Sequence, residues 1–365
     1  GELGDFVTLK RGFDLPQQKR EDGQVPIFSS SGITGTHSTA MVKAPGVITG
    51  RYGTIGEVFY AAKDFWPLNT TLFVEDFHGN DAKFIYYFLK TLEWSKFTSA
   101  SAVPGINRNT VHKEIVSLPD IETQRRIAST LSMFDEKIKI NTEINDNLEQ
   151  QAQSYFQELF VDNADPEWAI GTISDLGTVV GGSTPSKAKP EYYTESGIAW
   201  ITPKDLSINK SKFVSHGEND ITELGLRNSS AAIMPEGTVL FSSRAPIGYI
   251  AIAAGEVTTN QGFKSVVPKP EIGTPFVYFF LKNTLPVIEG MASGSTFKEV
   301  SGSTMKNVPA VIPDAETLAK FSDFCAPIFA QQRTLEEQNQ SLAKLRDSLL
   351  PKLMSGEIDV SAVQL

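Results

Sequence analysis

The sequence lacks the features that mark several common classes of protein. It contains one cysteine, Cys325, so no internal disulfide can form. No apolar run approaches the roughly 18 residues that a membrane-spanning helix needs. The first six residues lack the basic and apolar regions of a secretory signal peptide. We therefore exclude a disulfide-stapled secreted domain and a membrane-inserted protein, and we expect a cytoplasmic location.

Basic charge is also scarce, because 33 Lys and Arg residues face 43 Asp and Glu residues, for a net charge of −10. Residues 1–117 hold 12 basic and 12 acidic side chains, and residues 161–312 hold 12 and 15. Residues 118–160 hold 4 and 8, and residues 313–365 hold 5 and 8. Most of the excess negative charge thus lies outside the two larger segments, and either segment can still present a basic face to DNA phosphates. Partner subunits are expected to supply further positive surface.

The signatures of metal and nucleotide sites are missing. None of the four histidines, His37, His78, His112 and His216, shows the spacing of a metal site. The glycines at positions 50, 53 and 56 have the wrong spacing for a dinucleotide loop, and the sequence contains neither a P-loop nor the Asn/Asp-Pro-Pro-Tyr string of adenine methyltransferases. We therefore expect no metal and no cofactor on this chain.

One pattern imitates a nuclease metal site, namely Pro119-Asp120 followed by Asp135-Glu136-Lys137. Both parts fall on one predicted helix about 15 residues apart, which corresponds to some 22 Å of helical rise. Two carboxylates at that distance cannot share one Mg²⁺ ion. We interpret them as solvent-facing charges on a helix, and we predict that the chain has no catalytic residues.

An internal repeat organises the chain. Arg51 and the pair Ile55-Gly56 match Arg244 and the pair Ile247-Gly248, at offsets of 193 and 192 residues. Three more landmarks follow in the same order at offsets of 191 to 194 residues: Asn69 with Asn260, residues 84–90 with 276–282, and residues 116–120 with 310–314. This order indicates a tandem duplication of about half the chain.

Each copy is predicted to be a mixed α/β domain followed by a long helix. β-branched and aromatic runs between glycines predict strands at 47–49, 57–61 and 71–75, with a helix at 81–92. The second copy repeats this pattern with strands at 239–241, 249–253 and 263–267 and a helix from about 275 to 283. We place the first domain at 1–117, the first long helix at 118–160, the second domain at 161–312 and the second long helix at 313–358.

Both long helices carry the alternating spacing of three and four residues that is typical of a coiled coil. In the first helix the positions are Ile127, Leu131, Phe134, Ile138, Asn141, Asn145, Leu148, Ala152, Tyr155 and Leu159. In the second they are Leu318, Phe321, Cys325, Ile328, Gln332, Leu335, Asn339, Leu342, Arg346, Leu349 and Leu353. Asp120 and Asp314 suit helix N-termini, whereas Pro327 predicts either a kink or a helix that begins there.

The two seams are expected to pair with each other as an antiparallel coiled coil with approximate two-fold symmetry. Their polar positions would fix the register at some cost in stability. A helix of about 30 residues is about 45 Å long, slightly more than the roughly 34 Å of one DNA turn. Two domains so held could meet one duplex at separated segments of the major groove.

Two further strings join the repeated Arg-x(2–3)-Ile-Gly turn: Leu-Pro-Asp-Ile-Glu-Thr-Gln-Arg-Arg-Ile at 118–127, and Leu-Arg-Asp-Ser-Leu-Leu-Pro-Lys-Leu-Met-Ser-Gly-Glu-Ile at 345–358. On these motifs the chain resembles the specificity subunit of type I restriction-modification enzymes over nearly its whole length. The resemblance implies that each globular part is a target recognition domain for one half of a bipartite DNA site. It also implies that the helices set the spacing and bind two modification (methyltransferase) subunits, and that restriction subunits with translocase activity join the complex. The methyl donor and ATP are then expected on those partners alone.

Candidate DNA-reading residues are the polar side chains in loops beside the repeated turns, since such groups can pair with base edges or phosphates. In the first copy they are Lys10, Arg11, Ser29, Ser30, Ser31, Thr34, His37, Arg51, Tyr52, Asn107 and Arg108. In the second copy they are Ser183, Thr184, Ser186, Lys187, Lys204, Arg244, Ser295, Thr296 and Lys298. Any one of them could instead be a solvated turn residue, and Arg51 and Arg244 either contact DNA or form structural ion pairs.

Two alternatives belong to other classes of protein. A catalytic nuclease or methyltransferase fragment would act alone with Mg²⁺ or a methyl donor, and a coiled-coil assembly scaffold would bind proteins with no preference for DNA sequence. Cys325 lies on the heptad seam, and we interpret it as a buried core thiol and not as a nucleophile or a metal ligand.

Overall fold

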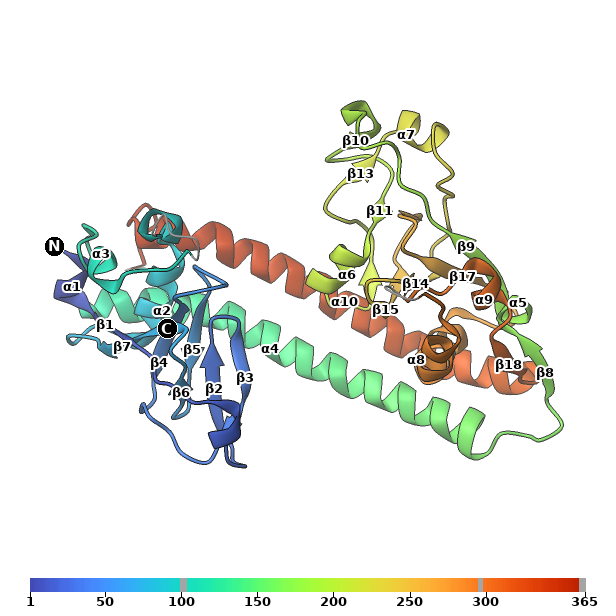
Figure 1. Ribbon diagram of the computed structural model, residues 1–365, viewed down its shortest axis with the longest axis horizontal. Helices are drawn as coiled ribbons and strands as arrows, with labels where there is room; N and C mark the ends of the chain where they lie inside the picture. The colour runs from blue at the N-terminus through green and yellow to red at the C-terminus, as the bar shows by residue number, and fades with distance from the viewer. Residues whose placement is uncertain (99–103, 295–297, 361–365) are drawn as a thin grey trace. The chain divides into compact units, whose positions relative to one another are not determined.

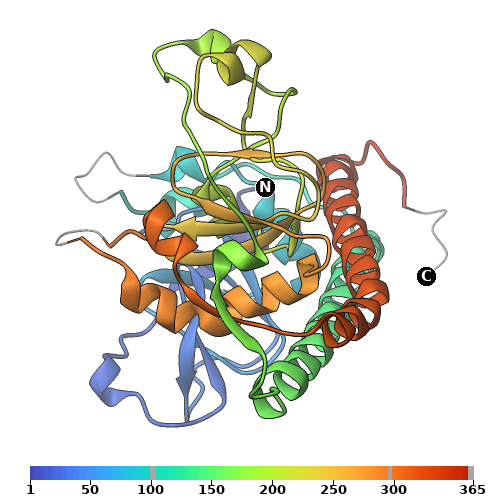
Figure 2. The ribbon, with the colours of Figure 1, turned by 90° about the vertical axis from the view of Figure 1, so that its right-hand side faces the viewer.

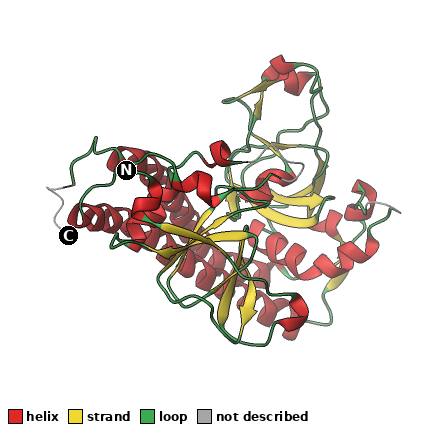
Figure 3. Ribbon diagram, turned by 60° about the vertical axis from the view of Figure 1, so that its left-hand side comes forward, coloured by secondary structure: helices red, strands yellow, loops and turns green. Residues whose placement is uncertain are grey.

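The computed structural model describes residues 1–98, 104–294 and 298–360 (Figure 1). It comprises two compact units: unit 1 is built from residues 1–138 and 341–365, and unit 2 from residues 139–340. Each unit contains a globular part and a segment of both long helices, α4 (Ile121–Gln157) and α10 (Ala315–Met354). The strands, yellow in Figure 3, belong to the globular parts. The predicted mixed α/β fold with two long helices is confirmed.

In unit 1 the main sheet has the order β1-β7-β4-β5 and the smaller one the order β3-β2-β6. The elements of its globular part are α1 (Leu3–Phe6), β1 (Thr8–Arg11), η1 (Gln17–Lys19), β2 (Val25–Ser29), β3 (Gly32–His37), β4 (Gly46–Gly50), β5 (Val58–Ala61), β6 (Trp66–Pro67), β7 (Thr71–Asp76), α2 (Ala82–Lys90), η2 (Trp94–Phe97) and α3 (Arg108–His112).

In unit 2 the main sheet has the order β12-β15-β14-β17-β9. After the helical turn η3 (Glu158–Asp162) come β8 (Ala169–Thr172), α5 (Ile173–Leu176), β9 (Gly177–Gly181), η4 (Pro190–Tyr192), β10 (Tyr193–Thr194), β11 (Trp200–Ile201), α6 (Pro203–Ile208), β12 (Phe213–Val214), β13 (Asp220–Ile221), α7 (Glu223–Arg227), β14 (Val239–Ser243), β15 (Ile247–Ala253), β16 (Thr258–Thr259), β17 (Lys264–Pro268), α8 (Thr274–Met291), α9 (Gly302–Lys306) and β18 (Pro309–Ile312).

The two main sheets are the same sheet twice. Strands β1-β7-β4-β5 correspond to β9-β17-β14-β15, and unit 2 adds β12 parallel to β15. The register agrees as well, because Val47 pairs with Tyr60 in unit 1 and Val239 pairs with Ile252 in unit 2, both shifted by 192 residues. The internal repeat predicted from the sequence is therefore present in the fold.

The local sequence explains why these elements form. The central strands β4 and β14 are buried along their whole length, as suits their apolar and small residues. Helix α2 begins where the Asp81 carboxylate accepts a hydrogen bond from the Phe84 amide. Helix α8 runs to Met291 instead of ending near 283, because Ile288, fully buried, continues its apolar face past Pro286.

Helices α4 and α10 pack antiparallel within each unit. In unit 1 the Asp135 carboxylate lies 2.5 Å from the Arg346 guanidinium, and in unit 2 the Asn141 amide donates to the Asn339 side chain at 2.9 Å. Figures 1 and 2 show the two helices, green and red, side by side in both views. Every predicted seam residue is buried or half-buried.

Both helix starts lie close to their predicted places. The Asp120 carboxylate accepts hydrogen bonds from the amides of Glu122 and Thr123, and Asp314 accepts one from the Thr317 amide. Pro327 does not start a helix, because α10 already begins at Ala315 and continues through it. Among the described residues, no helix combines the length and the apolar character that crossing a bilayer requires.

Candidate nucleic-acid interface

The turn that follows the central strand has the same backbone role in both units. The Arg51 carbonyl accepts from the Ile106 amide, and its own amide donates to Thr70. In unit 2 the Ser243 carbonyl accepts from the Val300 amide, and its amide donates to Gly262. Ser243 therefore stands in the place of Arg51, and Arg244 stands one residue later, in the place of Tyr52.

This equivalence corrects the sequence alignment of the two arginines. They match by letter at an offset of 193, whereas the backbone offset at this turn is 192 residues. The Ile-Gly pairs do coincide, because Gly56 and Gly248 both have positive φ, +89° and +96°. An added Cβ on Gly248 would come within 2.7 Å of Leu285, so glycine is required by the fold. The shared Ile-Gly letters are structural, and the arginines are not equivalent.

In unit 2 the structure gathers four predicted residues around one open groove of about 660 Å³. Thr184, Lys187, Lys204 and Arg244 line it, together with Trp200, Asn260 and Gln261. The groove lies where the loop after β9, the start of α6 and the turn after β14 meet. The groove thus brings together hydroxyl, amide, ammonium and guanidinium groups. Groups of these kinds pair with base edges and phosphates.

The cations of this groove differ in how firmly they are held. The Lys204 ammonium lies 2.6 Å from the Glu218 carboxylate, and this hydrogen bond raises the pKa of Lys204. Arg244 lies 3.6 Å from Glu299, whose other oxygen is 3.9 Å from the Lys264 ammonium. Burial lowers the pKa of Lys264. Lys187 is exposed at the rim.

In unit 1 the corresponding turn collects a smaller set. The Arg51 guanidinium lies 4.5 Å from the centre of the Tyr52 ring, and Ser30 lies against the turn, 3.3 Å from the position of a Cβ on Gly53. Asn107 follows Ile106 and caps α3 by accepting from the Asn109 amide. Arg108 is exposed beside it.

The other predicted residues of unit 1 lie away from this turn or are engaged elsewhere. Lys10 lies on β1 and pairs with Glu75 at 2.5 Å, and Arg11 lies 3.9 Å from Asp14. Ser29 and Ser31 bond to each other at the turn between β2 and β3, and Thr34 is exposed on β3.

His37 does not suit the role predicted for it. Its side chain is 6% exposed, its Nδ1 accepts from the Glu21 amide, and its ring packs edge-on against Trp66. A histidine held on both sides in this way supports the hairpin and offers little surface to a ligand. His37 is therefore corrected to a structural residue.

The remaining predicted residues of unit 2 are distributed around the same loops. Ser183 accepts from the Ser230 amide through its hydroxyl, Ser186 is exposed, and Lys298 is exposed next to Glu299. Ser295 and Thr296 lie outside the described residues.

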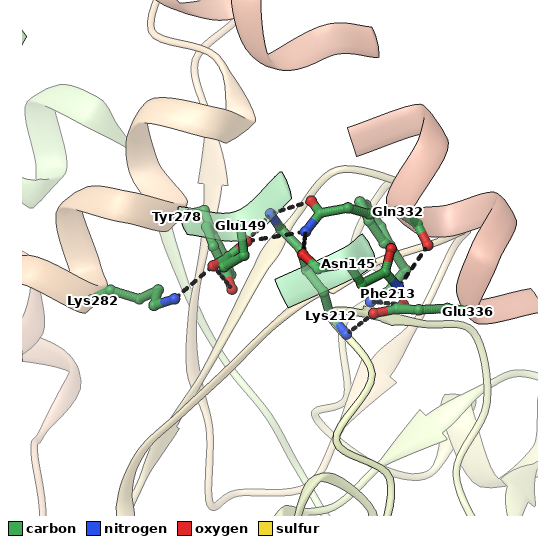
Figure 4. A network of polar contacts seen from close by, with 8 residues as sticks. All are labelled: Asn145, Glu149, Lys212, Phe213, Tyr278, Lys282, Gln332 and Glu336. Atoms are coloured by element: carbon green, nitrogen blue, oxygen red, sulfur yellow. Dashed lines mark hydrogen bonds and ion pairs between the residues drawn. The ribbon is translucent and has the colours of Figure 1, made fainter. Parts of the chain in front are cut away.

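Sequence reasoning missed a buried polar network that joins the globular part of unit 2 to both long helices (Figure 4). The Lys212 ammonium donates to Glu149 on α4 at 2.8 Å and to Gln332 on α10 at 2.9 Å. The Glu336 carboxylate accepts from the backbone amides of Lys212 and Phe213. The Lys212 side chain is only 7% exposed. The sequence pattern does not predict this contact, because Lys212 precedes a strand of only two residues and lies more than 60 residues along the chain from Glu149.

Further donors converge on Glu149. Lys282 lies 2.6 Å from it and the Tyr278 hydroxyl 3.0 Å from it, both on α8. Burial on its own would raise the pKa of Glu149, but the two ammonium groups lower it to about 2. Burial lowers the pKa of Lys212 to about 8, against the opposing effect of Glu149. The network holds four ionisable side chains, Lys212, Lys282, Glu149 and Glu336, within one hydrogen-bonded cluster.

The thiol and histidines carry no metal site in the described part of the chain, where no group of three or more His, Cys, Asp or Glu side chains could hold an ion. Cys325 is fully buried in the core of unit 2, and this burial raises the pKa of its thiol to about 12. Asp120 caps a helix, and Glu136 and Lys137 are exposed as expected, but Asp135 is half-buried and bonds to Arg346 and Tyr87, so its interpretation as a solvent-facing charge is wrong.

Comparison with known proteins places these features in one family. The family described as type I restriction modification DNA specificity domain matches residues 1–150 and 166–344. The MjaIX specificity subunit of Methanocaldococcus jannaschii is 37% identical over 195 residues, 53% of this chain and 45% of the relative, so the match spans less than half of that protein. The HindI specificity subunit of Haemophilus influenzae is 24% identical over 74% of this chain and 75% of its own length.

Two mycoplasma proteins match nearly the whole chain. A putative type I specificity subunit of Mycoplasma pneumoniae is 31% identical over 96% of this chain and 94% of its own. The crystal structure of a type I S subunit from M. genitalium shares the fold with a TM-score of 0.61 at 19% identity, over 97% of this chain and 95% of that one. These matches give no support to a catalytic fragment or to an unrelated scaffold. By its sequence motifs, its repeated sheet and these relatives, the chain belongs to the DNA specificity family of type I restriction-modification systems.

Proposed function

We propose that this chain selects the DNA sequence on which a type I restriction-modification complex acts. Unit 1 and unit 2 each read one half of a bipartite duplex site through the loops beside the repeated turn. The long helices set the spacing of the two halves and bind two modification subunits, and restriction subunits join this assembly. The chain itself acts as a binding subunit in the cytoplasm, with the methyl donor and ATP bound on its partners.

The observation that carries this proposal is the same sheet built twice with different loops. A shared register from β1 to β5 and from β9 to β15 fixes the position of the turn in each unit. The loops that meet at this turn then differ in sequence between the units, which is what two different half-sites require. The groove of unit 2 supplies polar and cationic groups of the kinds that read bases.

A domain exchange tests the division of labour. The chain is expressed together with its modification subunits, and methylated adenines are mapped on genomic DNA. Replacing residues 1–117 by the matching domain of another specificity subunit should change one half of the methylated site and leave the other half intact. The reciprocal exchange of residues 161–312 is the matched control and should change only the other half. A change in both halves from either exchange contradicts the proposal.

A further inference from the structure

Two positions face each other at the repeated turn of both units. In unit 1 Tyr52 forms an isolated β-bridge with Gly105, and in unit 2 Arg244 lies 3.6 Å from Glu299. Gly105 and Glu299 are equivalent, because each precedes the residue whose amide donates to the turn carbonyl, Ile106 or Val300. The same pair of backbone positions thus carries Tyr with Gly in one unit and Arg with Glu in the other.

Each pair is matched in size and charge. A Cβ at position 105 would come within 2.2 Å of the Tyr52 ring, so the ring needs glycine opposite it. The Arg51 guanidinium also lies against this ring, 4.5 Å from its centre. In unit 2 the guanidinium of Arg244 instead has a carboxylate opposite it, and a second cation, Lys264, lies beyond that carboxylate at 3.9 Å.

Of the three cations Arg244, Lys264 and Lys204, Arg244 is the one placed to reach a ligand. It lines the groove of unit 2, and 38% of its side chain is exposed, whereas Lys264 is 16% exposed and Lys204 is hydrogen-bonded to Glu218. A separation of 3.6 Å exceeds the length of a normal hydrogen bond. Glu299 therefore attracts the Arg244 guanidinium but accepts no hydrogen bond from it. Two parallel N–H groups of the guanidinium remain able to donate to two acceptors on one ligand.

We propose that positions 52 with 105 and 244 with 299 form the matched base-reading pair of each unit, and that Arg244 reads a guanine in the half-site of unit 2. Two guanidinium N–H groups donate to O6 and N7 of that guanine in the major groove, the pattern that identifies guanine there. Glu299 is the positioning residue. The Tyr52 ring cannot make this pair of bonds and selects a different base. This inference rests on the proposed function and names the residues that determine its specificity.

The test uses the chain in complex with its modification subunits. Competition binding is measured with duplexes in which each base pair of the mapped site is replaced in turn. The Arg244→Ala variant should lose about 10- to 100-fold of its discrimination at one G·C pair in the half-site of unit 2, and none in the half-site of unit 1. Glu299→Gln should lose less at the same base pair. Arg227→Ala is the control, because Arg227 is an exposed arginine of unit 2 paired with Glu223 outside the groove.

A base analogue separates direct contact from support of the fold. Replacing that guanine with 7-deazaguanine removes the N7 acceptor, so it should weaken binding of the unaltered chain and leave binding by Arg244→Ala unchanged. The paired exchange Arg244→Tyr with Glu299→Gly should move the preference at that base pair away from G·C.

The outcomes separate the base-reading pair from the proposed function. If Arg244→Ala weakens binding equally at all base pairs, or at none, the base-reading pair is wrong while sequence recognition by the chain stands. If the unaltered complex shows no sequence preference, both the pair and the proposed function fail.

Discussion

The globular parts of the two units share a sheet but attach to the long helices through different chemistry. In unit 2 Lys212 reaches between α4 and α10 and bonds to both, with Glu149 at the centre. In unit 1 the Tyr87 hydroxyl bonds to Asp135, which pairs with Arg346 of the opposite helix. Tyr87 corresponds to Phe279 of unit 2, which packs on Phe329 without a polar bond between them. The repeated helix, α2 in unit 1 and α8 in unit 2, thus contacts the long helices in both units, but through different polar side chains.

The difference follows from strand β12, which unit 1 does not share in its main sheet. This strand adds to the sheet edge beside β15, and Lys212 comes directly before it. A lysine that enters a helix interface from an added strand needs acceptors for its ammonium group, and Glu149 and Gln332 provide them, while Glu336 accepts from the Lys212 backbone amide. The comparison shows that one fold can be joined to the same helices either by a tyrosine bonded to an ion pair between the helices or by a larger buried cluster.

The largest effect is expected from removal of the central lysine. Lys212→Ala should lower the free energy of unfolding of unit 2 by about 3–5 kcal/mol, since loss of one partner of a buried pair leaves a charged neighbour less compensated. Urea titration, with hydrogen exchange of peptides from 139–340, measures it. Lys210→Ala, an exposed lysine two residues away, is the control and should change the value by less than about 0.5 kcal/mol. Equal effects of the two substitutions would show that the buried cluster does not anchor unit 2.

Acid should act on the same cluster through Glu149. Because its folded pKa is lowered from 4.5 to about 2, the stabilisation from its charge is fully present above pH 4.5 and is lost as the pH falls toward 2. The loss should amount to about 2 kcal/mol at pH 3 and about 3 kcal/mol at pH 2. Comparison of the unaltered chain with Glu149→Gln in urea titrations from pH 6 to pH 3 isolates this contribution. Parallel pH curves for the two proteins would refute it.

The ion pair of unit 1 should contribute less. Arg346→Ala should lower the free energy of unfolding of unit 1 by about 2 kcal/mol, because its side chain and that of Asp135 are 18% and 26% exposed and keep some contact with water. Lys344→Ala, exposed on the same helix, serves as the reference. A larger loss from Arg346→Ala than from Lys212→Ala would reverse the comparison between the units.

The smallest effect is expected at the polar seam of unit 2. Replacing both Asn141 and Asn339 with leucine should raise the free energy of unfolding by about 1 kcal/mol, since a polar pair on a coiled-coil seam costs stability. Asn147→Leu, exposed on α4, is the control. Thermal unfolding reports the change, and a lower melting temperature for the double variant would mean that the Asn141–Asn339 bond is a net source of stability.

The features that the sequence predicted well are those that repeat or alternate. The heptad spacing located both long helices to within a few residues. The strand at 47–49 was found because β-branched residues lie between glycines, and the strand at 239–241 because the second copy repeats the first. Periodicity succeeds there because it reflects burial of one face, which is a property of the local sequence.

What the sequence did not reveal depends on contacts between distant residues. The arginine letters at 51 and 244 align one residue out of place, because only the backbone hydrogen bonds of the turn show which residue follows the strand. The burial of His37 depends on Trp66 of a strand far along the chain. Nothing in the local sequence distinguishes Lys212 from a surface lysine, because its burial depends on the two long helices. The candidate DNA-reading residues remain predictions, since side-chain letters in loops do not reveal which of them share a groove.

The division of the chain into units has a consequence for its synthesis on the ribosome. Unit 2 is one uninterrupted stretch, residues 139–340, whereas unit 1 needs residues 341–365 to join residues 1–138. Leu350 and Leu353, near the end of α10, are buried in the core of unit 1. The half of the protein that is translated first is therefore the half whose interior is completed last, and the nascent N-terminal domain must wait with an open apolar surface until the final helix emerges.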